Sequence, residues 1–189
     1  MYSLPLEIDA GGQILAIRNK GDYRTIIDCI TALNDDELND FEKSNAALYI
    51  FYDVDNVLDI KNWDAAIEEM MKFISVSDDI GTDADVKCID WEEDEKLVVA
   101  AVNKVRGEEI RALPYLHWWS FIASYMEIGE STLATIIGIR VKIKKGKSLD
   151  SWERDFRNNN PEYFMWKKDR DKQLKDKQLI DDIWERTDH

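Results

Sequence analysis

Residues 114–126 read PYLHWWSFIASYM, an almost wholly apolar stretch that sets His117 beside two adjacent tryptophans. Successive residues of a helix point about 100° apart, so Trp118 and Trp119 face different sides. The other apolar residues cover most of the remaining circumference: Tyr115, Phe121, Ile122, Tyr125 and Met126. A helix that is apolar all round is buried. We therefore predict a central helix over 115–126, with Pro114 in its first turn.

His117 lies inside this stretch together with Trp118, Trp119 and Phe121, and we take these four residues as the core signature of the chain. A polar ring in apolar surroundings needs a hydrogen bond. A catalytic histidine would also need a nucleophile and an orienting carboxylate, and Ser120, one turn away, has no nucleophile turn around it. We predict that His117 makes a local hydrogen bond within the core.

Helical spacing recurs on both sides of the central helix, and short strand-like runs precede it. Residues 4–9 and 13–18 flank the turn Ala10–Gly12 and predict a hairpin. The expected helices span 22–34 with Asp22 as cap, 35–52 with the acidic first turn DDE, 63–74, 91–107 and 130–137, the last closed by Gly138. Residues 75–85, rich in Ser, Asp and Gly, read as a loop.

The last forty residues differ in texture from the rest of the chain, and a basic segment precedes them. Residues 139–147 (IRVKIKKGK) alternate like a strand or form an exposed loop. After Asn160 and Pro161 a charged helix is expected, and its thin apolar stripe needs a partner surface on this domain or on another subunit: Phe164, Leu174, Ile180, Ile183 and Trp184. The predicted fold is mainly α, with a helical domain over 1–147, a short N-terminal β-hairpin and a charged helical extension over 148–189.

The chain of 189 residues carries a formal net charge of -14. That balance argues against nucleic-acid binding, which depends on Lys and Arg replacing phosphate counterions. Residues 111–148 are basic by contrast, and we expect Lys144 and Lys145 to contact an acidic surface of another copy, giving a homo-oligomer. The sequence shows no signal peptide and no apolar stretch of about 18 residues. We therefore expect a cytosolic protein that does not interact with a membrane.

Several stretches were weighed as sites of chemistry. Asp53, Asp55 and Asp59 resemble a calcium loop, but Leu58 occupies the glycine position. The carboxylates of DWEEDE (90–95) cannot all converge from one helix, and AGG (10–12) lacks the spacing of a phosphate loop. Cys29 and Cys88 are isolated. We expect no catalytic, cofactor or metal site; a small hydrolase or metal-dependent enzyme is the rival hypothesis.

The order of several segments resembles a protein family of tailed phages of Gram-positive hosts, the gene-product-fifteen family. The segments are LPLEIDAGGQILAIR, DYRTIIDCITALNDDELNDFEKSNAALYIFY, IDWEEDEKLVVAAVNKVRGEEI, LHWWSFIASY and LATIIGIRVKIKK. They cover residues 2–147, and Leu-His-Trp-Trp-x-Phe is the most specific among them. The resemblance supplies no catalytic residues.

The resemblance implies a tail assembly chaperone, which coats the aggregation-prone tape measure protein in the host cytoplasm and is absent from the mature virion. The alternative is a structural tail or connector subunit that stays in the particle. For the partner-binding surface we single out Met70, Met71, Phe73 and Ile74, since methionine adapts to varied apolar partners. Their helical spacing equally fits a place in the core.

Overall fold

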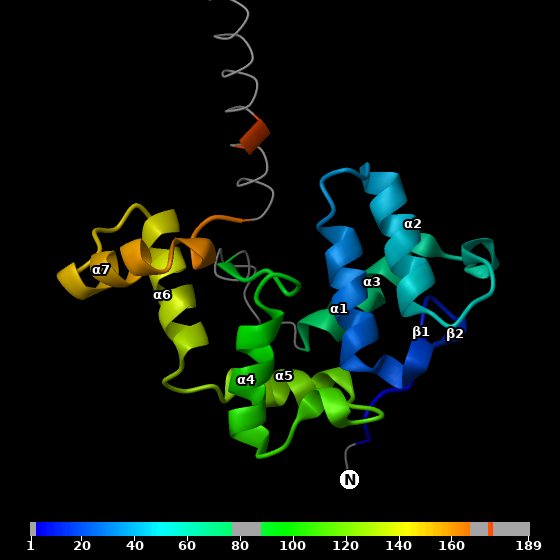
Figure 1. Ribbon diagram of the computed structural model, residues 1–189. Helices are drawn as coiled ribbons and strands as arrows, with labels where there is room; N and C mark the ends of the chain where they lie inside the picture. Colours follow the sequence, from blue (N-terminus) through cyan, green and yellow to red (C-terminus); the bar gives the residue numbers. More distant parts are fainter. Residues whose placement is uncertain (1–2, 77–87, 167–173, 176–189) are drawn as a thin grey trace, which may run out of the picture.

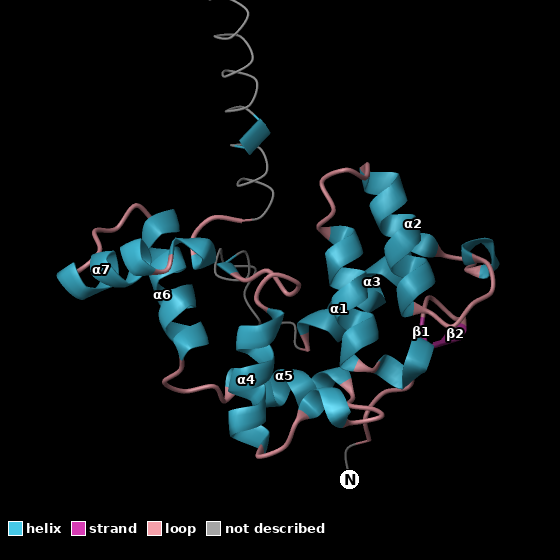
Figure 2. Ribbon diagram, in the orientation of Figure 1, coloured by secondary structure: helices cyan, strands magenta, loops and turns pink. Residues whose placement is uncertain are grey.

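The computed structural model describes residues 3–76, 88–166 and 174–175. The fold is mainly helical with one two-stranded antiparallel hairpin, as predicted (Figure 2). The strands are β1 (Glu7–Asp9) and β2 (Ile14–Ala16). The helices are α1 (Tyr23–Leu33), α2 (Asp40–Phe51), α3 (Trp63–Ser75), α4 (Glu95–Arg106), α5 (Trp118–Met126), α6 (Thr132–Lys144) and α7 (Ser151–Asn159), and single 3₁₀ turns lie at Arg18–Gly21, Val57–Asp59, Ile110–Ala112 and Pro161–Tyr163.

The helices follow one another along an open arc (Figure 1). The hairpin and α1 to α3 form one side, α4 and α5 the middle, and α6 with α7 the other side. Helix α1 packs against α2, while α5 contacts both α1 and α4, and α6 contacts α4. The main apolar core therefore runs from the hairpin through α5 to the start of α6.

Helix α5 is the centre of this core, as its sequence predicted. Trp118 and Phe121 are fully buried, and their rings stack with centroids 5.6 Å apart. The indole N–H groups of Trp118 and Trp119 donate to the carbonyls of Ile74 and Phe73 at 2.9 and 3.0 Å. Because the last carbonyls of a helix lack partners within it, these bonds both satisfy the end of α3 and fix α5 against it.

The predicted start of this helix was wrong by several residues. Residues 114–117 are not helical, because Asp22 captures this segment: its Oδ2 accepts from the Leu116 N–H at 2.9 Å, and Tyr23 N donates to Leu116 O. His117 is instead the N-cap of α5. Its Nδ1 accepts from Trp119 N at 3.0 Å, which confirms the predicted local hydrogen bond.

The hairpin, α1 and α3 form where they were predicted. Glu7 to Asp9 pair with Ala16 to Ile14 across a turn in which Gly11 and Gly12 have φ of 70° and 91°. Asp22 caps α1 by accepting from Arg24 N at 3.0 Å. Local signals suffice for these elements, because each one has its capping or turn residue immediately beside its apolar pattern.

Helix α2 begins later than predicted. Asn39 accepts from the N–H groups of Phe41 and Glu42, and Glu42 accepts from Asn39 N in return. This reciprocal capping box starts the helix at Asp40. Residues 35–37 therefore precede the helix instead of forming its first turn.

The second half of the chain departs most from the prediction. Residues 139–144 are neither strand nor loop, because α6 runs through Gly138, and Ile136, Ile139 and Arg140 are buried at helical spacing. Helix α7 was not predicted; Asp150 and Glu153 start it with a capping box. Pro161 opens only a 3₁₀ turn. Most of the predicted C-terminal helix, with Ile180, Ile183 and Trp184, lies outside the described residues, as do residues 77–85 of the predicted loop.

Candidate partner-binding groove

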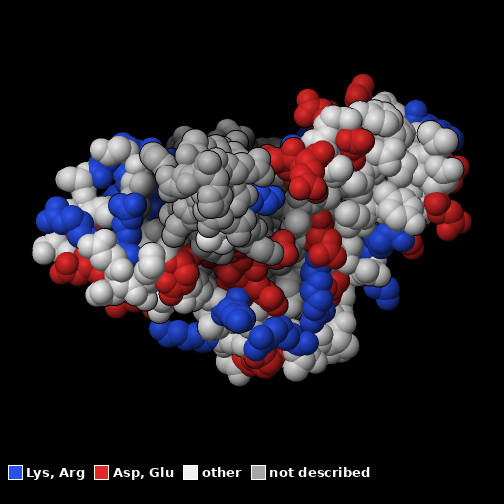
Figure 3. Space-filling model, turned by 45° about the horizontal axis from the view of Figure 1, so that its top comes forward, with Lys and Arg blue, Asp and Glu red and all other residues white. Residues whose placement is uncertain are grey.

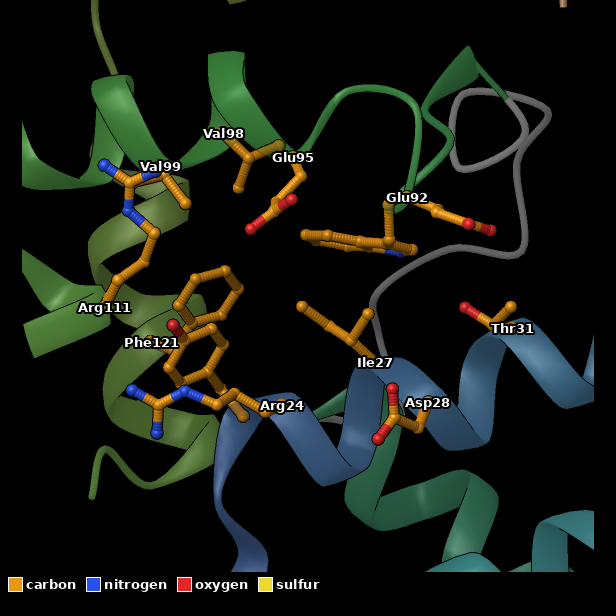
Figure 4. A pocket seen from close by; sticks show the side chains of 12 residues that line it. Arg24, Ile27, Asp28, Thr31, Glu92, Glu95, Val98, Val99, Arg111 and Phe121 are labelled. Atoms are coloured by element: carbon orange, nitrogen blue, oxygen red, sulfur yellow. The ribbon is translucent and has the colours of Figure 1, made fainter. Parts of the chain in front are cut away.

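A groove opens between α1 and α4, above α5 (Figure 4). Its volume is about 450 Å³. The floor and sides are Tyr23, Ile27, Trp91, Val98, Val99 and Phe121, and the rim is Arg24, Asp28, Thr31, Glu92, Glu95 and Arg111. Five of the six rim residues are charged, whereas all six floor residues are aromatic or aliphatic. Most of the apolar lining is closely packed, since Tyr23, Val98, Val99 and Phe121 are at most 5% exposed, and Ile27 and Trp91 are half-buried.

Helix α1 supplies one wall because its residues repeat at helical spacing. Tyr23, Ile27 and Thr31 lie four residues apart and share one face, and the adjoining face with Ile26 and Cys29 is fully buried. Ile27 is half-buried and Thr31 is exposed. This face of α1 therefore changes along the helix, from Tyr23 in the core to Thr31 at the surface.

The floor is a stack of aromatic rings. Tyr23 and Phe121 are parallel, with centroids 4.6 Å apart and planes at 9°. Trp91 meets Phe121 at 6.1 Å and Trp118 at 5.9 Å. Offset stacks of this kind add to area burial and hold the rings in fixed orientations. Burial raises the pKa of Tyr23, so its hydroxyl stays neutral at the floor. These rings form part of the packed core, because Tyr23 is 5% and Phe121 0% exposed.

The groove carries charges of both signs, and Glu95 points into it from the half that holds the arginines (Figure 4). Arg24 and Arg111 lie at one end in Figure 4, and Asp28 and Glu92 at the other. Arg24 is held by Asp22 at 3.2 Å and by the carbonyls of Leu113 and Ile110 at 2.8 and 3.2 Å. The arginine end is consequently a fixed feature of the groove.

Two carboxyl groups at or beside the groove have displaced pKa values. Arg111 pairs with Glu109 through two bonds of 2.9 Å, and these bonds lower the pKa of Glu109 to about 2. Asp28 shows the reverse effect, because burial raises the pKa of its carboxyl. A cationic group placed beside Asp28 would offset this desolvation cost.

The residues predicted to bind a partner do not line the groove. Met70 and Phe73 are in the core, with the Met70 sulfur 3.7 Å from that of Cys29 and Phe73 edge-on to Phe51. Ile74 is half-buried, and Met71 is 46% exposed. The four share α3 but not one surface, and among them Met71 is the most exposed.

Lys144 and Lys145 lie at the end of α6, on the other side of the arc from α3 (Figure 1). Both are exposed. Their neighbour Lys142 is bound to Glu153 at 2.6 Å, an interaction that ties α7 to α6. The predicted contact residues on α3 and the two lysines at the end of α6 therefore lie on different sides of the molecule.

Sequence reasoning missed the groove and one buried ion pair. Ile27 was not singled out, and the polar residues Asp28 and Thr31 close to it are the sequence signal that this side of α1 reaches the surface. Arg140 is 8% and Asp94 1% exposed, and they pair through contacts of 2.5 and 3.0 Å. The sequence feature that could have indicated this buried ion pair is the position of Arg140, four residues after the apolar Ile136 and so on the same face of the helix.

A model of the bacteriophage Gp15 protein family matches residues 3–163. The chain belongs to this family. No curated protein and no solved structure matches the chain. The match includes all groove residues of this Gp15-family protein and extends past residue 147 through α7. Family membership indicates a phage structural or morphogenesis protein.

Within residues 3–76, 88–166 and 174–175, no group of three His, Cys, Asp or Glu side chains is placed to hold a metal ion. No helix in the described part of the chain combines the length and the apolar character that crossing a membrane requires.

Proposed function

We propose that this phage protein is a non-enzymatic tail assembly chaperone that binds the tape measure protein and keeps it soluble during tail morphogenesis. The observation that carries the proposal is membership of the Gp15 family over residues 3–163. The groove supports it, because the half-buried Ile27 and Trp91 beside a charged rim suit transient contact with an amphipathic segment better than chemistry on a small substrate.

The physical properties of the chain fit that role. A formal charge of -14 would keep a complex with a long apolar partner dispersed in solution. Many copies along one partner would gain from avidity, so that each contact could be weak and reversible. We include self-association in the proposal, with Lys144 and Lys145 as the contact residues, because these exposed lysines belong to the basic part of an acidic chain.

The test is coexpression of the full chain with the tape measure protein of the same phage. We expect the tape measure protein to move from the insoluble fraction into a soluble complex that co-purifies with the chain. An unrelated acidic helical protein of similar size is the control for a general effect of charge. A tape measure protein that stays insoluble and unbound would refute the proposal.

Purified phage particles distinguish this proposal from a structural subunit. A chaperone should be absent from mature particles when they are examined by mass spectrometry. Presence in a fixed ratio to known tail proteins would show instead that the protein is retained in the virion. Tight divalent-cation binding in calorimetry would favour an enzyme over either role.

A further inference from the structure

We propose that two copies of the chain associate through opposite ends of the arc. The basic turn of one copy, residues 144–152 between α6 and α7, docks on the acidic turn of another, residues 35–42 between α1 and α2. This inference rests on the self-association that the proposed function includes. It adds the surface of the second copy that receives Lys144 and Lys145.

The two sides of the arc carry net charges of opposite sign. Residues 3–76, which form the hairpin and α1 to α3, contain 6 basic and 15 acidic residues. Residues 132–166, which form α6 and α7, contain 7 basic and 4 acidic residues. The two segments lie on opposite sides of the molecule (Figure 1), and basic side chains gather over the side that holds α6 and α7 (Figure 3). Complementary potentials favour contact between unlike ends of two copies and oppose contact between like ends.

The acidic turn is exposed where α1 and α2 join, at the top of Figure 1. It holds five carboxylates in its eight residues, DDELNDFE, and no basic residue. Asp35 Oδ1 accepts from Glu37 N at 2.9 Å, and the capping box of Asn39 and Glu42 fixes the start of α2. Glu37 and Asp40 are exposed. The backbone of this turn is therefore preorganised, which limits the entropy lost on docking.

The basic turn is held in place by bonds between α6 and α7. Gly146 has a positive φ of 65°, and Lys147 N donates to Lys142 O at 2.9 Å, which closes α6. Lys142 in turn binds Glu153 of α7 at 2.6 Å. The lysines on the turn itself are all exposed: Lys144, Lys145 and Lys147. The basic turn thus presents its charges from a fixed backbone, as the acidic turn does.

Each turn also presents an exposed aromatic side chain. Phe41 is 66% exposed, although its ring stacks on that of Trp63 with centroids 5.8 Å apart. Trp152 is 56% exposed at the start of α7. Aromatic residues are enriched in protein interfaces, because they bury a large apolar area. Each surface therefore combines charge of one sign with an aromatic residue that contact with a second copy would remove from water.

The other group of clustered carboxylates, at residues 90–95, is a less suitable acceptor. Asp94 is already paired with Arg140. Asp90 Oδ1 accepts from the N–H groups of Glu92 and Glu93 at 3.0 and 2.8 Å. Within residues 88–97, all of which the structure describes, no large apolar side chain is exposed. The start of α4 therefore lacks the aromatic contact that the acidic turn offers.

Sedimentation velocity of the full chain at low salt tests the acceptor surface. Glu37→Lys with Asp40→Lys, the acidic-turn reversal, changes the net charge from -14 to -10, since each reversal adds two. We expect the dissociation constant for self-association to rise about tenfold, although the smaller net charge reduces general repulsion. Glu7→Lys with Asp55→Lys, the control reversal, gives the same net charge from exposed positions elsewhere in residues 3–76 and should not raise the constant. Equal constants for the two variants would overturn the proposed acceptor.

Combined variants test whether the two turns meet each other. Lys144→Glu with Lys145→Glu should weaken association when introduced alone. Adding the acidic-turn reversal should bring the dissociation constant back to within about threefold of the wild type, because opposite charges face each other again. Adding the control reversal instead also restores the net charge of -14 but leaves the pairing broken, so association should stay weak. Equal recovery with the two additions would show that net charge alone governs association and would refute the contact.

Photo-cross-linking between copies gives a readout that does not depend on affinity. A photoreactive amino acid replaces Phe41 in a chain labelled with heavy isotopes, and this chain is mixed with unlabelled chain. Mass spectrometry should show capture of unlabelled residues 144–152. Capture of a different segment of the second copy would refute the acceptor surface.

The same measurements separate this contact from the wider proposal. Association that the lysine reversals weaken and the acidic-turn reversal leaves unchanged would refute the acceptor and leave self-association standing. A wild-type chain that stays monomeric at low salt would refute both the contact and self-association. The chaperone role would then still depend on coexpression with the tape measure protein, which measures binding to a different partner.

Discussion

His117 uses both of its ring nitrogens in the core. Its Nδ1 accepts from Trp119 N at 3.0 Å, and its Nε2 lies 3.1 Å from Pro5 O. A ring nitrogen that faces an N–H must be unprotonated, and one that faces a carbonyl must carry the proton, so these contacts define one neutral tautomer. Sequence reasoning predicted a local bond from burial alone. It could not predict Pro5, which is distant in the chain.

Because protonation would put a hydrogen between Nδ1 and Trp119 N, acid should destabilise the fold through this residue. Burial lowers the pKa of His117 from 6.5. Below pH 6.5 the unfolded chain binds a proton that the folded chain resists, so stability falls as the pH decreases from 6.5. We expect His117→Asn, which keeps a capping acceptor, to flatten the urea stability profile between pH 7 and 5. A slope equal to that of the wild type would contradict the assignment.

Asp94 and Arg140 form an ion pair that joins the start of α4 to α6. The pair is buried, and Arg140 also donates to the carbonyls of Cys88 and Tyr163 at 3.1 and 2.7 Å. Its guanidinium lies 4.2 Å from the ring centroid of Trp166. One side chain thus holds three segments together. In the sequence alone, Arg140 resembles an exposed charged residue. Its burial becomes evident only when the neighbouring residues of α6 are known to be buried.

Removing Asp94 should leave the Arg140 charge buried without its partner. We expect Asp94→Ala to lower the free energy of unfolding by about 3–5 kcal/mol, as measured by urea denaturation. Asp53→Ala is the control, because Asp53 is exposed and its contact with Arg18 is 3.6 Å long. That change should cost less than about 1 kcal/mol. Similar losses in the two variants would show that the ion pair is not buried in solution.

Among the elements, α6 shows why local signals mislead. Gly138 was interpreted as a helix stop, since glycine is common at helix ends. In the structure it is an interior residue of α6, and a positive φ occurs instead at Gly146, after the helix. The apolar residues of α6 support a helix through residue 144. The alternation of apolar and basic residues after Gly138, however, is also typical of a strand. Only packing against α4 decides between these two patterns.

Gly138 and Gly107 provide a matched pair to test this helix boundary. Both have open space where a Cβ would lie, but only Gly107 has a positive φ, 71°. We expect Gly138→Ala to stabilise the protein by about 0.5–1 kcal/mol, because alanine favours a helix interior. Gly107→Ala should destabilise it by about 1–2 kcal/mol. Thermal unfolding followed by circular dichroism measures both. A loss of stability in Gly138→Ala would mean that α6 ends at this residue.

At the scale of the whole molecule, the groove could not be predicted because it is assembled from distant segments. Tyr23 and Ile27 come from α1, Val98 from α4 and Phe121 from α5. Periodicity indicates which face of each helix is apolar. It does not show which part of that face stays open after the helices pack. The core signature could be predicted from the sequence, because a helix that is apolar all round must be buried whatever its neighbours are.

The distribution of charge over the molecule leads to a prediction about self-association. Figure 3 shows acidic side chains gathered in the middle of one face, with basic side chains below them and toward the side that holds α6 and α7. Lys144 and Lys145 lie at the end of α6. If acidic and basic regions of two copies meet, association should weaken when salt shortens the screening length from about 30 Å at 0.01 M to 10 Å at 0.1 M.

Reversing both lysines tests this contact by sedimentation velocity at low salt. Lys144→Glu with Lys145→Glu changes the net charge from -14 to -18, since each reversal subtracts two. We expect the mass distribution to shift to smaller species. Lys61→Glu with Lys96→Glu changes two exposed lysines elsewhere and gives the same net charge, so it should shift the distribution less. Equal shifts in the two variants would attribute the effect to general repulsion, and an unchanged association state after Lys144 and Lys145 are reversed would refute the contact.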